Sequence, residues 1–318
     1  MEKKVQIVMD YGHVNWVIGG LFREMFESSP ELFIQPIKIS PLRSRHVIFS
    51  VIYVIRLKIR KTPILFTSIT PLQNFTKYSK LNSNFKAIVF THYAGELPEN
   101  IKKLLNSIDL IFCLSSKERE RLIRSGVKTS IYVVVGAINS NRFREVSVGG
   151  TKIAWVGTPV SRKNPEIFLN FVEETPELEF LLLGRGWSQS GLMAKVNSLK
   201  NLEYKEINNA LTSSDFTGCS HYLMMSKWEG GPMPLLESLA AGLIPICTDV
   251  GFCRELMAQV GYEKQILEFP IAFSSIKKLL KKKYSLVHRQ EVSVKVKYYS
   301  FELLGYQIYT KIWDRKSV

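Results

Sequence analysis

Short apolar runs of about five residues recur along the chain, separated by longer segments with helical spacing. Val5–Met9 is the first such run and Lys152–Val156 is a later one, and each leads into a glycine-bearing turn. Strands of this length that alternate with helices predict parallel sheets buried on both faces. The pattern therefore indicates an α/β fold of the doubly wound type.

Two series of these runs divide the chain, with the polar Gly149-Gly150 segment between them. A length of 318 residues suits about two domains. We therefore expect one Rossmann-like domain over residues 1–147 and a second over residues 148–297. The expected strands are Val5–Met9, Phe33–Ile37, Ile64–Thr67, Ala87–Phe90, Leu110–Cys113, Ile131–Val135, Lys152–Val156, Glu179–Leu183 and Ile244–Cys247, and the clearest helices are Val47–Arg60 and Pro165–Glu174.

Composition narrows the class of protein further. A hydrophobic content of 46% supports packed cores and argues against disorder. The formal net charge of +15 implies an anionic partner: nucleic acid, an anionic membrane or a phosphorylated substrate. No nucleic-acid motif accompanies the charge, so we expect no nucleic acid partner. Four cysteines without metal-ligand spacing, and an N-terminus without a signal-peptide pattern, predict a cytoplasmic protein without a metal site.

The most specific stretch runs from Trp228 to Thr248. It predicts a loop, a helix, a turn and a strand, because Gly-Gly-Pro at 230–232 interrupts regular structure and Pro234 suits a helix start. Two carboxylates, Glu229 and Glu237, flank the start of that helix. A helix N-terminus attracts phosphate through its free N–H groups and its dipole. The stretch is therefore suited to binding a sugar nucleotide.

This stretch resembles the E-x7-E motif of retaining GT-B glycosyltransferases, in particular glycosyltransferase family 4. The segment after Lys152–Val156 resembles the family's G-R-x-x-x-x-K-G motif, with Lys163 at the lysine and Thr158 where arginine is usual. Arg162 is a candidate to supply the missing charge. The resemblance implies two Rossmann-like domains facing across a cleft, with a C-terminal helix at 298–318 that crosses back to the first domain.

The resemblance also implies a retaining transfer of sugar from a UDP- or GDP-type nucleotide sugar to a glycan or lipid-linked acceptor, in cell-surface polysaccharide or lipopolysaccharide synthesis. Neither metal nor cofactor is expected, because Lys163 and Arg162 would neutralise the diphosphate. Glu237 would hold the ribose hydroxyls and Glu229 would lie beside the donor sugar. Retention in this fold is attributed to same-face attack, so no general base is assigned. The other residues that the motifs place at the donor are Gly157, Thr158, Gly184, Gly186, Gly230, Gly231, Pro232 and Met233.

Candidate acceptor-side residues lie in the first half, where the resemblance is looser. His92 follows the strand Ala87–Phe90, and related enzymes place a histidine at this strand end near the transferred sugar. The resemblance therefore makes His92 a candidate catalytic residue, alongside Glu229 and Lys163. Gly19 and Gly20 match a glycine pair near the donor phosphate or the acceptor, and His13 follows the first strand. A structural histidine or a packing glycine is the alternative interpretation for each of them.

The segment Val47–Ile55 is the most apolar in the chain and is flanked by basic residues at Arg43, Arg45, Arg56, Lys58, Arg60 and Lys61. It is too short to span a bilayer. Because it is apolar on all sides, it can form a buried core helix. The alternative is a monotopic anchor that holds the protein on the inner face of a membrane, with its basic end on anionic headgroups.

Two other functions fit part of the pattern: a sugar-nucleotide epimerase on the same fold, and a catalytically inactive partner subunit of a transferase complex. The motif around Glu229 argues against the epimerase. Because threonine stands at position 158, where the family motif has arginine, an inactive partner subunit is an alternative interpretation.

Overall fold

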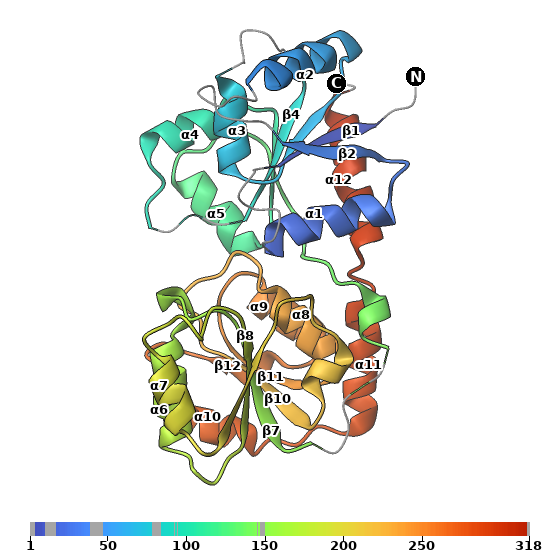
Figure 1. Cartoon of the computed structure of the whole chain (residues 1–318). Helices are drawn as coiled ribbons and strands as arrows, with labels where there is room; N and C mark the ends of the chain where they lie inside the picture. Colours follow the sequence, from blue (N-terminus) through green and yellow to red (C-terminus); the bar gives the residue numbers. More distant parts are fainter. Residues whose placement is uncertain are drawn as a thin grey trace. The chain divides into compact units, whose positions relative to one another are not determined.

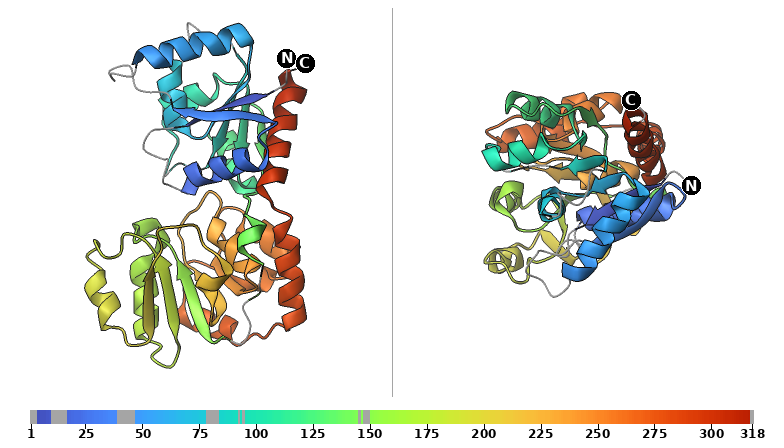
Figure 2. Two further views of the ribbon diagram at one scale, coloured as in Figure 1. Left: turned by 45° about the vertical axis from the view of Figure 1, so that its right-hand side comes forward. Right: turned by 90° about the horizontal axis from the view of Figure 1, so that it is seen from above.

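The structure is a computed structural model that describes the following parts of the chain: 4–9, 17–38, 47–77, 84–91, 93, 95–144, 146 and 150–316. The chain forms two compact units, one comprising residues 1–137 with 300–318 and the other residues 138–299 (Figure 1). Each unit holds one six-stranded sheet whose described pairings are parallel, with helices on both faces (Figures 1 and 2). The predicted doubly wound α/β architecture is therefore confirmed.

The sheet of the first unit has the strand order β2-β1-β3-β4-β5-β6. β2 contains Pro36 and lies at the sheet edge, where a missing ladder N–H is tolerated. The strands are β1 (Val5–Met9), β2 (Phe33–Lys38), β3 (Ile64–Phe66), β4 (Lys86–Phe90), β5 (Leu110–Cys113) and β6 (Ile131–Val133). The helices are α1 (Val17–Ser28), α2 (Val47–Arg60), α3 (Ile69–Thr76), α4 (Glu99–Leu105), α5 (Ser116–Arg124) and α12 (Phe301–Lys316).

The C-terminal helix α12 belongs to the first unit, although the second unit precedes it in sequence. It packs against α1 (Figure 2). Gly305 permits this close approach, since a Cβ there would lie 3.1 Å from Phe33 and 3.2 Å from Met25. Among the residues described, no helix of either unit is long and apolar enough to cross a membrane.

The sheet of the second unit has the order β12-β11-β10-β7-β8-β9. Its strands are β7 (Lys152–Val156), β8 (Phe180–Gly184), β9 (Leu202–Glu206), β10 (Cys219–Met224), β11 (Ile244–Thr248) and β12 (Ile266–Leu267). Its helices are α6 (Pro165–Glu173), α7 (Met193–Ser198), α8 (Met233–Ala240), α9 (Cys253–Gln259), α10 (Phe273–Leu280) and α11 (Leu286–Lys297).

The strand order of this second sheet changes direction between β7 and β10. From β7 the chain adds β8 and β9 on one side, and it then returns to add β10, β11 and β12 on the other. Loops at the carboxyl ends of two such strands separate and leave a crevice, which is where open parallel sheets bind ligands. The loops that follow β7 and β10 are therefore where this fold would be expected to bind a ligand.

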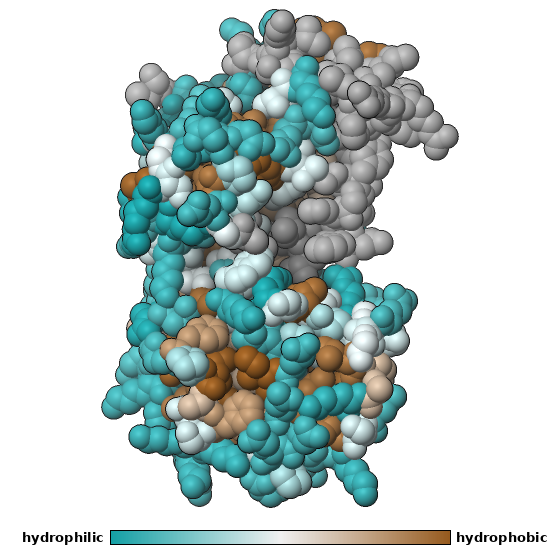
Figure 3. Space-filling view, turned by 90° about the vertical axis from the view of Figure 1, so that its left-hand side faces the viewer, coloured by the Kyte–Doolittle hydropathy of each residue, from teal (hydrophilic) through white to brown (hydrophobic). Residues whose placement is uncertain are grey.

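The core of the second unit is rich in aromatic residues. Trp155 stacks on Phe168 with ring centroids 5.2 Å apart, and Trp187 meets Trp155 edge-on at 5.5 Å. All three side chains are at most 2% exposed. Figure 3 shows that apolar side chains also reach the surface of this unit, on the side of α6 and α7, within a hydrophilic surround. This packed aromatic core supports the loops that adjoin it.

The boundary between the units lies earlier than the sequence predicted. The predicted boundary follows residue 147, whereas the second unit begins at Ile138. The Ile138 N–H donates to the Tyr299 carbonyl, and Val146 packs on Gly242, where a Cβ would lie only 2.2 Å away. Gly150 is likewise not a linker residue, because its backbone packs against Gly218. These contacts are between distant parts of the chain, so local sequence could not reveal them.

Candidate active site

The loop that follows β7 carries two basic residues. It runs through a 3-10 turn, Ser161–Lys163, to Asn164, which precedes α6. Asn164 adopts the left-handed conformation (φ 54°, ψ 49°), which asparagine tolerates better than most residues. Pro165 then begins α6, where its missing N–H costs nothing. The turn thus holds Arg162 and Lys163 just beyond the carboxyl end of β7.

The loop that follows β10 carries the first carboxylate of the motif, Glu229, and leads into α8. Pro234 lies in the first turn of α8, and Gly242, with φ 77°, follows its end. The predicted sequence of loop, helix, turn and strand is therefore confirmed. Glu237 lies one turn into α8 and is partly exposed.

Two hydrogen bonds to backbone carbonyls join these loops. Asn164 Nδ2 donates to the Met225 carbonyl at 2.7 Å, and the Lys227 N–H donates to the Arg162 carbonyl at 2.7 Å. β7 and β10 are neighbours in the sheet, so the loops meet at the point where the strand order changes direction. Each loop therefore fixes the backbone of the other.

Glu229 is the centre of a buried ion cluster. Its Oε1 accepts hydrogen bonds from Lys163 Nζ at 2.9 Å and from Ser226 Oγ at 3.1 Å, and its Oε2 pairs with the Arg162 guanidinium. The side chains of Glu229 and Lys163 are only 7% and 11% exposed. The Arg162 guanidinium also lies over the Trp228 ring, with its Cζ 5.3 Å from the ring centroid. This cation–π contact restrains the guanidinium beside Glu229.

The surrounding charges keep Glu229 ionised. Burial by itself would raise the pKa of this carboxyl. The positive charges of Lys163 and Arg162, with their hydrogen bonds, outweigh that effect and hold the pKa below its usual range. The cluster therefore combines one anion with two cations, and its net positive charge suits an anionic ligand.

Substitution of Glu229 by glutamine is expected to lower the free energy of unfolding by about 1–3 kcal/mol at pH 7, because two buried cations lose their counter-charge. The folded-state pKa lies below the unfolded value of about 4.3, so the stabilisation is complete above that value and is lost as pH falls through the folded-state pKa. Urea denaturation from pH 7 down to pH 3 measures the difference between the two proteins, which should shrink in acid.

The control for this prediction is Glu203→Gln, which removes a half-exposed carboxylate paired with Lys152. That variant should change the unfolding free energy by at most about 1 kcal/mol. A difference between wild type and Glu229→Gln that stays constant across the pH range would contradict the ion cluster.

The start of α8 offers fewer backbone donors than the motif predicts. Pro232 and Pro234 carry no N–H, and the Leu235 N–H donates to the Pro232 carbonyl at 3.0 Å. The backbone donors that this turn can present to a phosphate are therefore those of Gly231 and Met233. Lysine and arginine side chains must therefore supply more of the positive charge that stabilises a bound phosphate.

Two of the predicted donor-binding glycines make room for atoms of the protein itself. A Cβ on Gly184 would lie 1.9 Å from the Gly157 carbonyl oxygen, which also accepts a hydrogen bond from Trp187 Nε1 at 2.8 Å. A Cβ on Gly157 would lie 2.6 Å from Lys163 Cδ. The glycines thus let the β7 and β8 loops pack together and clear the path along which Lys163 reaches Glu229.

The remaining predicted donor-side residues lie around the same loops. Gly186 follows β8 with φ 78° and is exposed, and Thr158 follows β7 and is partly exposed. Gly230 is buried, and its carbonyl is packed close to Gly251, where a Cβ would lie 2.8 Å from it. The structure therefore gathers Lys163, Arg162 and Glu229 into direct contact and places the other donor-side residues on adjacent segments.

Sequence reasoning did not single out Ser226 or Asn164. Ser226 donates to Glu229, and its carbonyl accepts from Thr248 Oγ1 at 2.7 Å, which ties the loop to β11. Asn164 joins the two loops. Its position between a basic turn and Pro165 is the one sequence signal that could have identified it, because asparagine before a helix-starting proline is typical of a special backbone conformation.

The predicted acceptor-side residues belong to the first unit. His13 and His92 lie outside the described residues, and Gly19 and Gly20 lie in the first turn of α1. Their acceptor-side roles therefore stay predictions.

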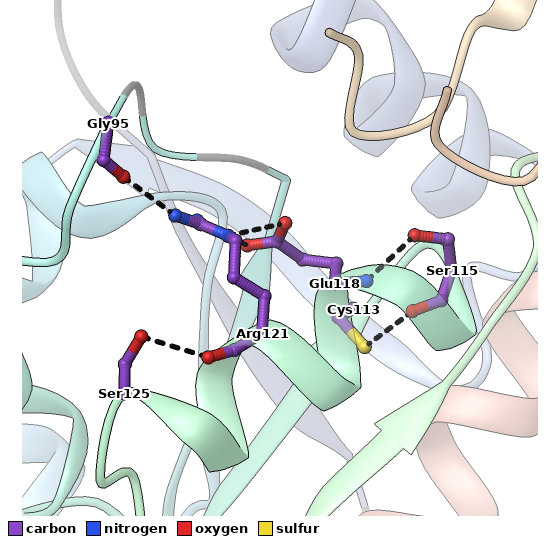
Figure 4. Close-up of polar contacts among 6 residues, drawn as sticks. All are labelled: Gly95, Cys113, Ser115, Glu118, Arg121 and Ser125. Atoms are coloured by element: carbon purple, nitrogen blue, oxygen red, sulfur yellow. Dashed lines mark hydrogen bonds and ion pairs between the residues drawn. The ribbon is translucent and has the colours of Figure 1, made fainter. Parts of the chain in front are cut away.

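A network on α5 holds the segment between β4 and α4 at Gly95 (Figure 4). The Gly95 carbonyl accepts from Arg121 Nη1 at 2.9 Å, and Arg121 pairs with Glu118 at 2.6 Å. The Glu118 N–H in turn donates to Ser115 Oγ at 3.2 Å, which caps α5. This network restrains the Gly95 carbonyl, three residues beyond His92 in the sequence.

The chain has two Rossmann-like units, and the second carries basic side chains where its strand order changes direction. This arrangement is common among α/β proteins that bind nucleotides. Comparison with known families is more specific. The chain belongs to the family "Glycosyl transferases group 1", whose model matches residues 139–299, nearly the whole second unit. The predicted glycosyltransferase family is therefore confirmed.

Among curated proteins, the chain is similar to the O-antigen biosynthesis glycosyltransferase WbnH of Escherichia coli. The two are 25% identical over 224 residues, which is 64% of this chain and 64% of WbnH. The matched region thus spans less than two thirds of the relative's own length.

Solved structures confirm the GT-B fold. HepE of Anabaena, solved in complex with UDP and glucose, superposes with a TM-score of 0.74 at 11% identity, covering 98% of this chain and 100% of HepE. The lipopolysaccharide outer core galactosyltransferase WaaB superposes with a TM-score of 0.67 at 14% identity, covering 98% of this chain and 99% of WaaB. At such low identity these likenesses support the fold, and they do not by themselves assign a substrate.

Proposed function

We propose that this glycosyltransferase moves a sugar from a UDP- or GDP-type nucleotide sugar to a glycan or lipid-linked acceptor, with retention of configuration and without a metal ion. The observation that carries the proposal is the ion cluster, in which Lys163 and Arg162 converge on Glu229 where the strand order changes direction. A diphosphate leaving group needs positive charge at this place in the fold.

In the proposed reaction the bond from the anomeric carbon to the diphosphate oxygen breaks, and its electron pair stays on that oxygen. Lys163 and Arg162 stabilise the charge that develops there, together with the N–H groups of Gly231 and Met233. The acceptor oxygen attacks the anomeric carbon from the same face and passes its proton to the leaving phosphate. The protein therefore needs no dedicated general base.

The two carboxylates have separate roles in the proposal. Glu229 is ionised and buried, so it can orient sugar hydroxyls or stabilise positive charge at the anomeric carbon. Glu237 is more exposed, one turn along α8, and is assigned to the ribose hydroxyls. WbnH and WaaB, as their names state, act in O-antigen and lipopolysaccharide core synthesis, which supports an acceptor from cell-surface polysaccharide assembly.

The acceptor is proposed to bind the first unit, with His92, His13, Gly19 and Gly20 as candidate contacts. A lipid-linked acceptor would require the enzyme to work at a membrane. We therefore propose a cytoplasmic protein that associates with the inner face of the membrane.

A thermal-shift screen of nucleoside diphosphates and their sugars tests the donor assignment. A ligand at 100 times its Kd adds about 2.7 kcal/mol, which should raise Tm by about 5–10 °C for a unit of this size. We expect UDP or GDP to produce this shift in the wild type and a much smaller one in Glu237→Ala. The absence of a shift with every nucleoside diphosphate would contradict the proposal.

Incubation of the wild type with the donor that binds then separates the candidate activities. Slow hydrolysis without acceptor, and transfer when a glycan acceptor is added, support the transferase, and NMR of the product anomer tests retention. Conversion of the nucleotide sugar to its epimer would favour an epimerase. Binding without hydrolysis or transfer would favour an inactive partner subunit.

A further inference from the structure

The positive charge of the chain is concentrated in one part of the first unit. Between Leu32 and Gly95 the sequence has ten lysines and arginines and no aspartate or glutamate. This segment therefore supplies ten of the fifteen net positive charges of the protein. It contains α2, the helix for which the sequence left both a buried and a membrane-bound interpretation open.

The structure shows that α2 has two opposite apolar faces. Val54 and Leu57 are 0% and 3% exposed and belong to the core of the first unit. Ile52, Ile55 and Ile59 are 59%, 41% and 77% exposed. With 100° between successive helical residues, these isoleucines form a ridge almost directly opposite the buried face. The helix is thus attached to the unit by one apolar face and presents a second one outward.

Cations flank this isoleucine ridge. On a helical wheel Arg56 and Arg60 lie on one side of it and Lys58 on the other. Neither arginine pairs with a carboxylate in the parts of the chain that the structure describes. Both line a hollow of about 200 Å³ beside α2, together with Tyr53, Thr62, Ile34 and Leu57. The hollow offers two guanidinium groups to an anion close to the ridge, and the Tyr53 hydroxyl that lines it donates to Gln6 Oε1 at 2.6 Å.

We propose that α2 is a membrane-docking surface, with Ile52, Ile55 and Ile59 inserted among the lipid chains and the flanking cations on anionic headgroups. Arg56 and Arg60 would take a headgroup phosphate in the hollow beside the helix. Helices that lie in a membrane interface typically have outward-facing apolar residues flanked by cations. The isoleucine ridge has no aromatic side chain on which a nucleic acid base could stack, and its aliphatic side chains do not bind the phosphate backbone of nucleic acid.

This inference deepens the proposed function, because a docked first unit would meet a lipid-linked acceptor at the membrane surface. Binding to vesicles is measured without donor or acceptor. Failure of docking is therefore distinguishable from failure of sugar transfer, which a water-soluble acceptor analogue reports separately.

The test is flotation of the full chain with vesicles of phosphatidylcholine alone or mixed with phosphatidylglycerol. The wild type should float with the phosphatidylglycerol vesicles at low salt, more weakly at high salt, and hardly at all with phosphatidylcholine. Arg56→Gln combined with Arg60→Gln should weaken the anionic binding by about 30-fold. Ile52→Gln combined with Ile59→Gln should weaken it by at least about 10-fold and abolish the part that survives high salt.

Matched controls come from the second unit. Lys277→Gln with Lys278→Gln removes the same charge from α10, and Val287→Gln with Val294→Gln alters two exposed apolar residues of α11. Both controls should float like the wild type. All variants change exposed side chains, so Tm and transfer to a soluble acceptor should be unchanged in each.

Wild-type protein that ignores phosphatidylglycerol vesicles at low salt would overturn the inference. So would α2 variants that float as well as the wild type, or controls that lose as much binding. If the α2 variants lost binding to RNA or to an acidic protein but kept vesicle binding, the surface would belong to that partner instead.

Discussion

Replacing Lys163 with alanine is expected to lower kcat by about 100- to 1000-fold, because the proposed leaving group loses a buried, preorganised cation. The donor KM should change less, since the effect is concentrated in the transition state. Stability should fall by only about 1–3 kcal/mol, because Arg162 still pairs with Glu229. Steady-state kinetics, with Tm as a check on folding, measure both effects.

Glu237→Ala provides an independent test of the same site and should also reduce turnover by orders of magnitude, with a rise in donor KM. Lys195→Ala is the matched control: Lys195 also pairs with a glutamate, Glu173 at 2.7 Å, but joins α6 to α7 at the surface. It should retain turnover within about twofold. Near-normal turnover in both Lys163→Ala and Glu237→Ala would defeat the assignment of the donor site.

Replacing Arg162 with alanine is expected to lower kcat by about 100-fold, because position 158 lacks the arginine that the family motif would supply. The structure places the Arg162 guanidinium on Trp228 and beside Glu229, where it can act in that arginine's place. Lysine at position 162 should recover only part of the loss, because it lacks a planar fork to bind phosphate and stack on tryptophan.

A second substitution tests whether Arg162 supplies positive charge to the diphosphate or has only a structural role. Arg162→Ala combined with Thr158→Arg should regain at least about tenfold in kcat if the two positions serve the same diphosphate. Lys227→Ala, which removes an exposed cation from the neighbouring loop, should have little effect. A double variant no more active than Arg162→Ala, with normal Tm, would show that position 158 cannot substitute for Arg162.

Much of the fold could be predicted because its signals are local. The boundaries of β1, β5, β7 and α2 match the predicted ones residue for residue. β10 was missed, although it leads into the Glu229 loop. Ser220 and His221 interrupt its apolar pattern, and only its central position between β7 and β11 shows why a strand forms there.

The candidate site could be predicted as a set of residues but not as an arrangement. Glu229, Lys163 and Arg162 were selected by motif, yet nothing in the sequence could indicate that both cations pair with one buried carboxylate. Nor could it show that Gly184 packs against Gly157. Side-chain direction depends on the neighbouring segment in space, which periodicity does not encode.

The sequence by itself determined the alternation of strands and helices and the chemistry of the loop from Trp228 to Met233, because hydrophobic spacing and Gly-Gly-Pro act on the backbone locally. The tertiary structure decided that β7 and β10 are neighbours, which brings a loop at 157–164 against one at 225–232. It also decided that Ile52, Ile55 and Ile59 of α2 face outward. Strand order and exposure arise from packing between distant segments, so they could be read only from the folded chain.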